Sequence, residues 1–315
     1  MNDSTPFVEA SATWKRLAER VAAQHWPAPA LYVVATPIGN LGDLGLRAWQ
    51  ALQRCDVIAA EDTRSSRPLL DAWGIATPMM AAHRHNEAAA AQSIVRRLEA
   101  GERVALISDA GAPAVSDPGA RIVRSVRAAG FPVVPVPGAS AVIAALMASG
   151  ATSDENPAYC FAGFPPPRSG ARQKWLRLWC AVPAPVVLFE SPHRVQATVE
   201  DMLAVCGADR RLTIARELTK RFEQIETLHL PEALEWLGAD SHRRQGEFVL
   251  ILHEGEAARG GPELDGQAVA LLEALLETLS LRDAVKVAVK VSGAPRDALY
   301  ALALELGKGR GGGAG

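Results

Sequence analysis

Short apolar runs alternate with helix-like segments along the first half of the chain, and this alternation restricts the fold more than any other feature of the sequence. Predicted strands cover residues 31–35, 57–60, 103–108 and 132–135. An unbroken apolar run of about five residues is typical of a strand buried on both faces of a parallel sheet. Strand and helix in alternation build an open α/β sheet. We therefore expect an α/β domain at residues 31–155.

The second half of the chain repeats this alternation and then changes character. Further strands are predicted at residues 159–162, 186–189, 211–215 and 247–253. They give a second α/β domain at residues 156–255, followed by a polar, glycine-rich linker at residues 254–262. Residues 1–30 predict an N-terminal arm, which is either an amphipathic surface helix or loose. Residues 264–307 predict a small helical unit, and residues 308–315 predict a disordered tail.

Charge and cysteine content exclude several classes of protein. Lys and Arg total 33 against 35 Asp and Glu, so there is no global basic field for nonspecific nucleic-acid binding and an RNA partner needs a local patch. No apolar run approaches the roughly 20 residues that span a bilayer. We expect a cytoplasmic protein with no membrane partner and no metal site. Its four cysteines lack C-x-x-C spacing and are expected to be reduced thiols: Cys55, Cys160, Cys180 and Cys206.

Glycine and proline follow three of the predicted strands, in the loops 36–43, 108–119 and 135–140. Ligands of open α/β sheets bind beyond the carboxyl ends of the strands, and glycine lets the backbone approach a ligand closely. The glycines of the first loop and the residues after it have the spacing G-x-x-G-x-x-G, not the G-x-G-x-x-G of dinucleotide-binding folds, and there is no P-loop motif. The loops predict a ligand site but disfavour a nicotinamide oxidoreductase.

Two groups of charged side chains also follow strands. Glu61 and Asp62 come directly after one strand, where a carboxylate can cap the next helix or take part in catalysis. Arg216, Glu217 and Lys220 follow another strand and fit either an ion-pair network or a site for an anionic substrate. The residues alone leave these interpretations open.

Basic and aromatic residues are interleaved at the start of the second domain, a composition that suits phosphate contact and base stacking. The expected RNA contacts are Arg168, Arg172, Lys174 and Arg194. Trp175 and Trp179 lie among them and fit base stacking or the core of an amphipathic helix equally well.

Seven of these stretches, taken in order, resemble one known family. They are LYVVATPIGNLGD at residues 31–43, AEDTR at 60–64, SDAGAPAVSDPG at 108–119, VPGASA at 136–141, ESPHR at 190–194, ARELTK at 215–220 and GEFVLI at 246–251. The chain resembles the ribosomal RNA small subunit methyltransferase I family, a branch of the tetrapyrrole methylase superfamily. Residues 281–306 are similar to the C-terminal helical unit of that family. The sequence departs from the family in Ala112, where threonine is usual, and in a longer arm before Leu31.

The resemblance implies two α/β domains of the tetrapyrrole methylase type with S-adenosylmethionine bound in the cleft between them. It implies 2′-O-methylation of a decoding-centre cytidine of 16S rRNA on the assembled small ribosomal subunit, by a homodimer that binds no DNA. The residues that match the cofactor loops of the family are Pro37, Ile38, Gly39, Asp109, Ala110, Gly111, Pro137, Gly138 and Ser140.

A ribose hydroxyl is a weak nucleophile at neutral pH, so the reaction needs a base or a cation that stabilises the developing alkoxide. The catalytic candidates are Glu61, Asp62, Arg216, Glu217 and Lys220, and the sequence does not show which of them accepts the proton. Two other functions fit the same residues. One is a tetrapyrrole C-methyltransferase, and the other is a non-catalytic RNA-binding protein of ribosome assembly.

Overall fold

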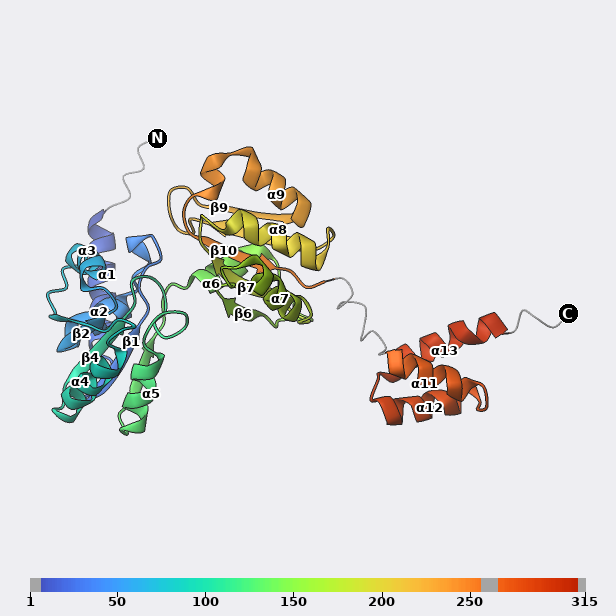
Figure 1. Ribbon diagram of the computed structural model, residues 1–315. Coiled ribbons are helices and arrows are strands. Elements are labelled where there is room, and N and C mark those ends of the chain that lie inside the picture. The colour runs from blue at the N-terminus through green and yellow to red at the C-terminus, as the bar shows by residue number, and fades with distance from the viewer. Residues whose placement is uncertain (1–6, 256–265, 311–315) are drawn as a thin grey trace.

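The computed structural model describes residues 7–255 and 266–310, which form two α/β domains and a three-helix unit (Figure 1). The first domain contains a parallel sheet with the strand order β3-β2-β4-β1-β5. Its strands are β1 (Ala30–Val34), β2 (Val57–Ala60), β3 (Met79–Ala81), β4 (Arg103–Ile107) and β5 (Val133–Val136). Strand β3 was not predicted from the sequence; it has three residues, lies at the sheet edge, and its side chains are only partly covered.

Helices cover both faces of this sheet because successive strand residues point to opposite sides. Tyr32 packs with Leu52 and Leu70 on one face, whereas Leu31 packs with Ile94 and Ile122 on the other. The first face carries α2 (Leu46–Arg54) and α3 (Thr63–Ala72), and the second carries α4 (Glu87–Glu99) and α5 (Ala120–Ala128). A short 3-10 helix, η1 (Leu41–Asp43), precedes α2.

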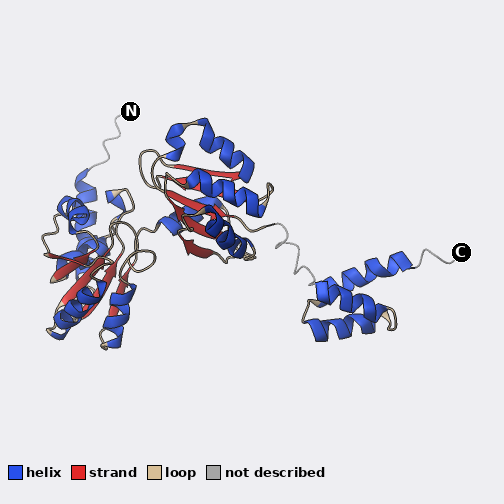
Figure 2. Ribbon diagram, in the orientation of Figure 1, coloured by secondary structure: helices blue, strands red, loops and turns tan. Residues whose placement is uncertain are grey.

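The second domain has a mixed sheet in the order β6-β7-β10-β8-β9, seen as red arrows in Figure 2. Its strands are β6 (Cys160–Gly163), β7 (Val186–Glu190), β8 (Arg211–Arg216), β9 (Gln224–His229) and β10 (Phe248–Leu252). The central strand β10 runs antiparallel to both of its neighbours. Strand β9 was not predicted from the sequence; it is an edge strand that mixes polar and apolar residues, most of them half-buried.

One face of the second sheet is covered by the helices α7, α8 and α9, which share a core with β7, β8 and β10. These helices are α7 (Ser169–Cys180), α8 (Val195–Cys206) and α9 (Leu230–Ala239), and the 3-10 helix η2 (Ser241–Arg244) follows. The opposite face packs against α6 (Ala141–Ser149), whose Val142 and Ala145 contact Val187 and Val249. Helix α6 therefore follows the last strand of the first domain but packs on the sheet of the second.

The N-terminal arm contains the helix α1 (Phe7–Ala22), so the surface-helix interpretation is confirmed for this part of the arm. The Arg54 guanidinium donates a hydrogen bond to the carbonyl oxygen of Ala22, with an Nη2–O distance of 2.8 Å. Arg103 donates to the carbonyl oxygens of Trp26 and Pro27. These bonds hold the end of the arm against the first sheet.

The C-terminal unit consists of α11 (Gly266–Leu276), α12 (Leu281–Ser292) and α13 (Arg296–Arg310), packed around Leu272 and Leu299. Helix α13 continues to residue 310, so the tail expected from residue 308 is wrong for its first three residues, and residues 311–315 lie outside the described chain. Most of the predicted linker, from residue 256 onward, also lies outside it. In the described ranges, no helix is long and apolar enough to cross a membrane.

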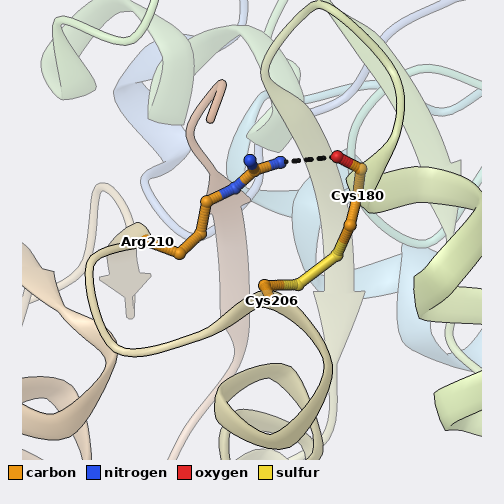
Figure 3. The surroundings of a disulfide bond; sticks show 3 residues. All are labelled: Cys180, Cys206 and Arg210. Atoms are coloured by element: carbon orange, nitrogen blue, oxygen red, sulfur yellow. Dashed lines mark hydrogen bonds between the residues drawn. A yellow bond between two sulfur atoms is a disulfide. The ribbon is translucent and has the colours of Figure 1, made fainter. Parts of the chain in front are cut away.

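Two of the four cysteines form a disulfide bond, between Cys180 and Cys206 (Figure 3). The expectation of four reduced thiols is therefore wrong for this pair. The two cysteines end α7 and α8, which share one core, so the bond joins residues that are 26 positions apart in the sequence. Cys55 and Cys160 are free thiols, and burial raises the pKa of Cys55 to about 12.

Candidate functional site

A cleft of about 370 Å³ lies where loops from both α/β domains meet. Its volume is in the range of pockets that hold small molecules. The first domain and α6 contribute Ile38, Ala110, Gly111, Ala112, Val115, Ser116, Asp117, Ser140, Ala141 and Val142. The second domain contributes Phe164, Phe189, Glu190, Ser191, Pro192, Leu218, Glu247, Phe248 and Val249.

The loops after β1 and β4 are joined directly at the cleft. Thr36 and Gly111 exchange two backbone hydrogen bonds, with N–O distances of 2.9 Å and 3.1 Å. The Thr36 hydroxyl also donates to the carbonyl oxygen of Ser108, at 3.2 Å. Gly111 has φ +82°, a conformation that side chains disfavour, and a Cβ atom there would lie 3.4 Å from the Ile38 side chain. A glycine at this position allows the two loops to come together.

The predicted cofactor residues lie in the loops after β1, β4 and β5, but only some of them face the cleft. Ile38, Ala110, Gly111 and Ser140 line it. The remaining five lie beside these residues in the chain without lining the cleft: Pro37, Gly39, Asp109, Pro137 and Gly138. Ala112, which departs from the family pattern, also lines it.

The apolar wall of the second domain was not predicted from the sequence. Phe164 follows β6, Phe189 belongs to β7, and Leu218 follows β8. Apolar residues beside strands are indistinguishable from core residues in a single sequence. The rule that ligands bind at strand ends could have identified the positions of Phe164 and Leu218, but not their contact with the cleft.

Carboxylates gather at the end of the first sheet. The Asp109 carboxylate accepts hydrogen bonds from the Asp62 amide at 3.2 Å and from the Ser65 hydroxyl at 2.6 Å. Burial, with Asp117 and Asp109 nearby, raises the pKa of Glu61. Burial also raises the pKa of Asp117, and the charge of Asp109 adds to the effect. Of these carboxylates, Asp117 lines the cleft.

Asp62 caps α3 through its carboxylate, which accepts a hydrogen bond from the Arg64 amide at 2.8 Å. This bond lowers the pKa of Asp62. The capping interpretation of Asp62 is therefore confirmed.

The raised pKa of Glu61 predicts a pH-dependent loss of stability. The ionised form is disfavoured in the folded protein, so folding stability falls as the pH rises through the unfolded and then the folded pKa. Glu61→Gln removes this loss, so we expect the variant to be more stable than wild type at pH 7 and to converge with it at low pH. Urea unfolding across a pH series tests this, and a variant that is less stable at pH 7 would contradict it.

An ion-pair network occupies the facing edge of the second domain. The Lys220 ammonium lies 3.0 Å from Glu217 Oε1 and 2.8 Å from Glu247 Oε2. Burial opposes the charge of Lys220, but the hydrogen bonds to Glu247 and Glu217 outweigh it and raise the pKa of the lysine. The stem of Lys220 packs against Gly39, where a Cβ atom would lie 2.5 Å from Lys220 Cγ. The network reaches the cleft through Glu247, which lines it.

Arg216 is buried, with 7 % of its surface exposed. Its guanidinium donates to the carbonyl oxygens of Gln245 and Phe222 and to the side-chain oxygen of Gln224. The expectation that Arg216 acts on a substrate is therefore wrong, because these acceptors enclose its guanidinium. The bonds connect the loop that follows β8 with the loop that precedes β10.

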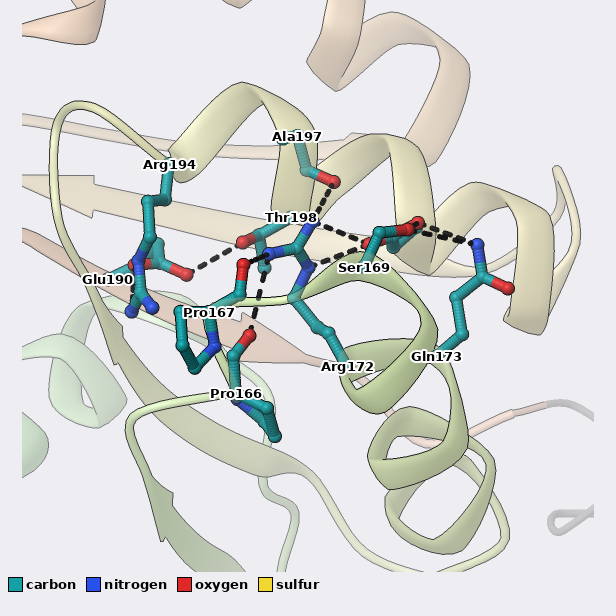
Figure 4. Close-up of polar contacts among 10 residues, drawn as sticks. Pro166, Pro167, Ser169, Arg172, Gln173, Glu190, Arg194, Ala197 and Thr198 are labelled. Atoms are coloured by element: carbon teal, nitrogen blue, oxygen red, sulfur yellow. Dashed lines mark hydrogen bonds and ion pairs between the residues drawn. The ribbon is translucent and has the colours of Figure 1, made fainter.

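Two predicted RNA contacts are also engaged inside the second domain (Figure 4). Arg172 is 4 % exposed and its Nη2 atom lies 2.6 Å from Asp201 Oδ2. The Arg194 guanidinium binds the buried Glu190 carboxylate at 2.7 Å. The structure corrects the expectation for Arg172, which no phosphate can reach, and leaves Arg194 partly exposed in an ion pair.

The other members of the predicted patch stay on the surface. Arg168 and Lys174 are exposed. Trp175 and Trp179 are half-buried and pack against the core of the second domain, which supports the core interpretation of both. In the part of the chain that the structure describes, no group of His, Cys, Asp and Glu residues could hold a metal ion.

Comparison with protein families identifies two regions of the chain. A family model described as tetrapyrrole (corrin/porphyrin) methylases matches residues 30–234. A second model, described as the RsmI C-terminal HTH domain, matches residues 262–307. Together they cover the first α/β domain, most of the second and the helical unit.

Solved structures with the same fold support this assignment. The methyltransferase CobJ has a TM-score of 0.53 at 18 % identity, over 71 % of this chain and 94 % of its own. Diphthine synthase has a TM-score of 0.54 at 14 % identity, over 71 % of this chain and 90 % of its own. The predicted tetrapyrrole methylase fold is confirmed.

Curated relatives are closer in sequence. Ribosomal RNA small subunit methyltransferase I of Neisseria meningitidis serogroup A is 46 % identical over 87 % of this chain and 92 % of its own. The protein of the same name from Pseudomonas aeruginosa is 42 % identical over 87 % of this chain and 96 % of its own. The chain therefore belongs to the ribosomal RNA small subunit methyltransferase I family of tetrapyrrole methylases.

Proposed function

We propose that the protein methylates the 2′-hydroxyl of a decoding-centre cytidine in 16S rRNA, using S-adenosylmethionine. Family membership supports the enzyme class and the RNA substrate. The observation that carries the proposal is the cleft itself, which joins an apolar wall from one domain to the half-buried carboxylate of Asp117 from the other. We further propose that it acts in the cytoplasm, as a homodimer, on the assembled small ribosomal subunit.

The residues of the cleft fit this cofactor. The solved structure of a uroporphyrin-III C-methyltransferase from Thermus thermophilus, which has a TM-score of 0.51 to this chain at 19 % identity, is a complex with S-adenosylhomocysteine. In this chain, Ile38 and Leu218 offer apolar contacts for an adenine, and the backbone at Ala110 and Gly111 is open to a ligand. The bound cofactor would supply an electrophilic methyl group on a sulfonium.

We assign the general base to Asp117. Its carboxylate lines the cleft and has no ion-pair partner within the described ranges, and burial raises its pKa. A carboxylate with a raised pKa is a stronger base than an exposed one, so it suits removal of the ribose hydroxyl proton. Glu61 lies beside Asp117 and contributes to this electrostatic environment.

Lys220 is assigned an electrostatic role, because it balances two carboxylates of which Glu247 lines the cleft. Lys220→Met keeps the side chain that packs on Gly39 but removes the charge. Unbalanced negative charge at the cleft disfavours an alkoxide, so we expect kcat to fall about tenfold with cofactor affinity retained. Single-turnover kinetics and calorimetry measure both, with Lys15→Met on the exposed face of α1 as control. Unchanged kcat in Lys220→Met would exclude this role.

The direct test uses radiolabelled S-adenosylmethionine and small ribosomal subunits from a strain that lacks the activity. After incubation, the rRNA is digested and its nucleosides are identified by mass spectrometry, and we expect label in 2′-O-methylcytidine. Cofactor binding without labelled RNA would instead favour a small-molecule C-methyltransferase. Absence of both would favour a non-catalytic RNA-binding protein.

A further inference from the structure

An exposed aromatic ring faces the cleft from the second domain. Phe164 is 57 % exposed although it lines the cleft. Its ring stands edge-on to Phe189, with centroids 5.5 Å apart, and Phe189 in turn stands edge-on to Phe161 at 4.9 Å. This aromatic row holds the Phe164 ring in place while leaving much of its surface open to a ligand.

The loop that follows Phe164 is fixed by the buried Arg172, whose guanidinium points at the carbonyls of Pro166 and Pro167 (Figure 4). The Arg172 guanidinium donates hydrogen bonds to the carbonyl oxygens of Pro166 and Pro167, and it is ion-paired with Asp201. Asp201 also accepts a hydrogen bond from the Ser169 hydroxyl at 2.8 Å. Three consecutive prolines further restrict the backbone between residues 164 and 168.

The same loop ends in an exposed cation. Arg168 precedes α7, and its side chain has no hydrogen-bond or ion-pair partner among the residues that the structure describes. A ring at the cleft and a free guanidinium four residues away match the two chemical parts of a nucleotide chain, a base with a π-face and a phosphate. A rigid loop binds such a chain at a lower entropic cost than a mobile one.

We propose that residues 164–168 form an RNA-binding loop in which Phe164 stacks on the base of the acceptor nucleotide and Arg168 binds a backbone phosphate. The proposal rests on the proposed function, because the acceptor ribose must enter this cleft and its base must then lie close to the cleft walls. Arg172 is a positioning residue in this scheme. It contacts the loop backbone and does not contact RNA.

Phe164→Ala tests the stacking contact. We expect the KM for small ribosomal subunits to rise about tenfold, in line with the loss of one stacked base, and the Kd of S-adenosylmethionine by calorimetry to stay unchanged. Phe164→Tyr keeps a stacking ring and should restore the KM. The matched control is Phe222→Ala, which removes a 65 % exposed phenylalanine of the same domain that does not line the cleft.

Arg168→Gln tests the phosphate contact, and should reduce the slope of log affinity against log salt by about one charge in filter binding to small subunits. Arg172→Lys keeps a cation near Asp201 but loses the fork that reaches the proline carbonyls, so it should raise the KM for subunits without changing cofactor affinity.

Weakened cofactor binding in Phe164→Ala would assign the ring to the cofactor and overturn the proposal. An unchanged KM for subunits would also overturn it. If wild-type protein labels no RNA at all, the proposed function itself fails, and this result is distinct because it does not depend on the variants.

Discussion

Asp117→Asn should lower kcat by about 100-fold or more while leaving the Kd of S-adenosylmethionine within a few-fold of wild type. The asparagine keeps the size of the side chain but cannot accept the ribose hydroxyl proton, and loss of a general base costs about 10²–10⁴ in rate. Asp117 is a half-buried carboxylate of the cleft without an ion-pair partner among the described residues, and its raised pKa predicts a second effect. The base is inactive when protonated, so the wild-type rate should fall as the pH drops through a pKa above the ordinary aspartate range.

Single-turnover rates over a pH series measure both effects. Asp154→Asn serves as the matched control, because Asp154 is exposed and does not line the cleft. If Asp117→Asn methylates RNA at nearly the wild-type rate, Asp117 is not the base. The other carboxylates of the cleft are Glu190 and Glu247. Glu190 is buried and paired with Arg194, so Glu247 would then be the next candidate.

Asp201→Ala should destabilise the protein by about 3 kcal/mol or more, the largest stability effect that we expect from a single side chain. Removal of the carboxylate leaves the buried Arg172 charge uncompensated, and breaking a buried pair in this way costs about 3–5 kcal/mol. The Ser169 hydroxyl and the Gln173 amide lose their acceptor as well. Urea unfolding followed by circular dichroism measures the change.

Two further variants separate charge burial from simple loss of packing. Glu200→Ala removes the neighbouring exposed carboxylate of α8 and should change stability little. Adding Arg172→Met to Asp201→Ala should recover part of the lost stability, because it removes the unpaired buried charge. A double variant as unstable as the sum of both single variants would contradict this explanation.

Most strands that the sequence predicted contain a continuous apolar stretch, because burial on both faces imposes that composition. The edge strand β3 has only three residues, and the edge strand β9 mixes polar and apolar residues, so the same criterion could not find them. A single sequence is limited in the same way for the arginines that were expected to bind RNA. The partner of Arg172 lies 29 positions away, and no local pattern reveals that its charge is neutralised inside the domain.

Helix α6 determines how the cleft can open. The helix begins at the loop that contains Ser140, yet it packs on the sheet of the second domain. Gly111 and Ile38, in contrast, follow strands of the first domain, and all three residues line the cleft. A rigid separation of the two sheets would therefore carry Ser140 away from Gly111, and a ligand that touches both would act as a clamp between the domains. Once the small ligand is bound, the cleft is therefore hardest to widen for a long RNA segment. This favours an RNA that presents a single extruded nucleotide.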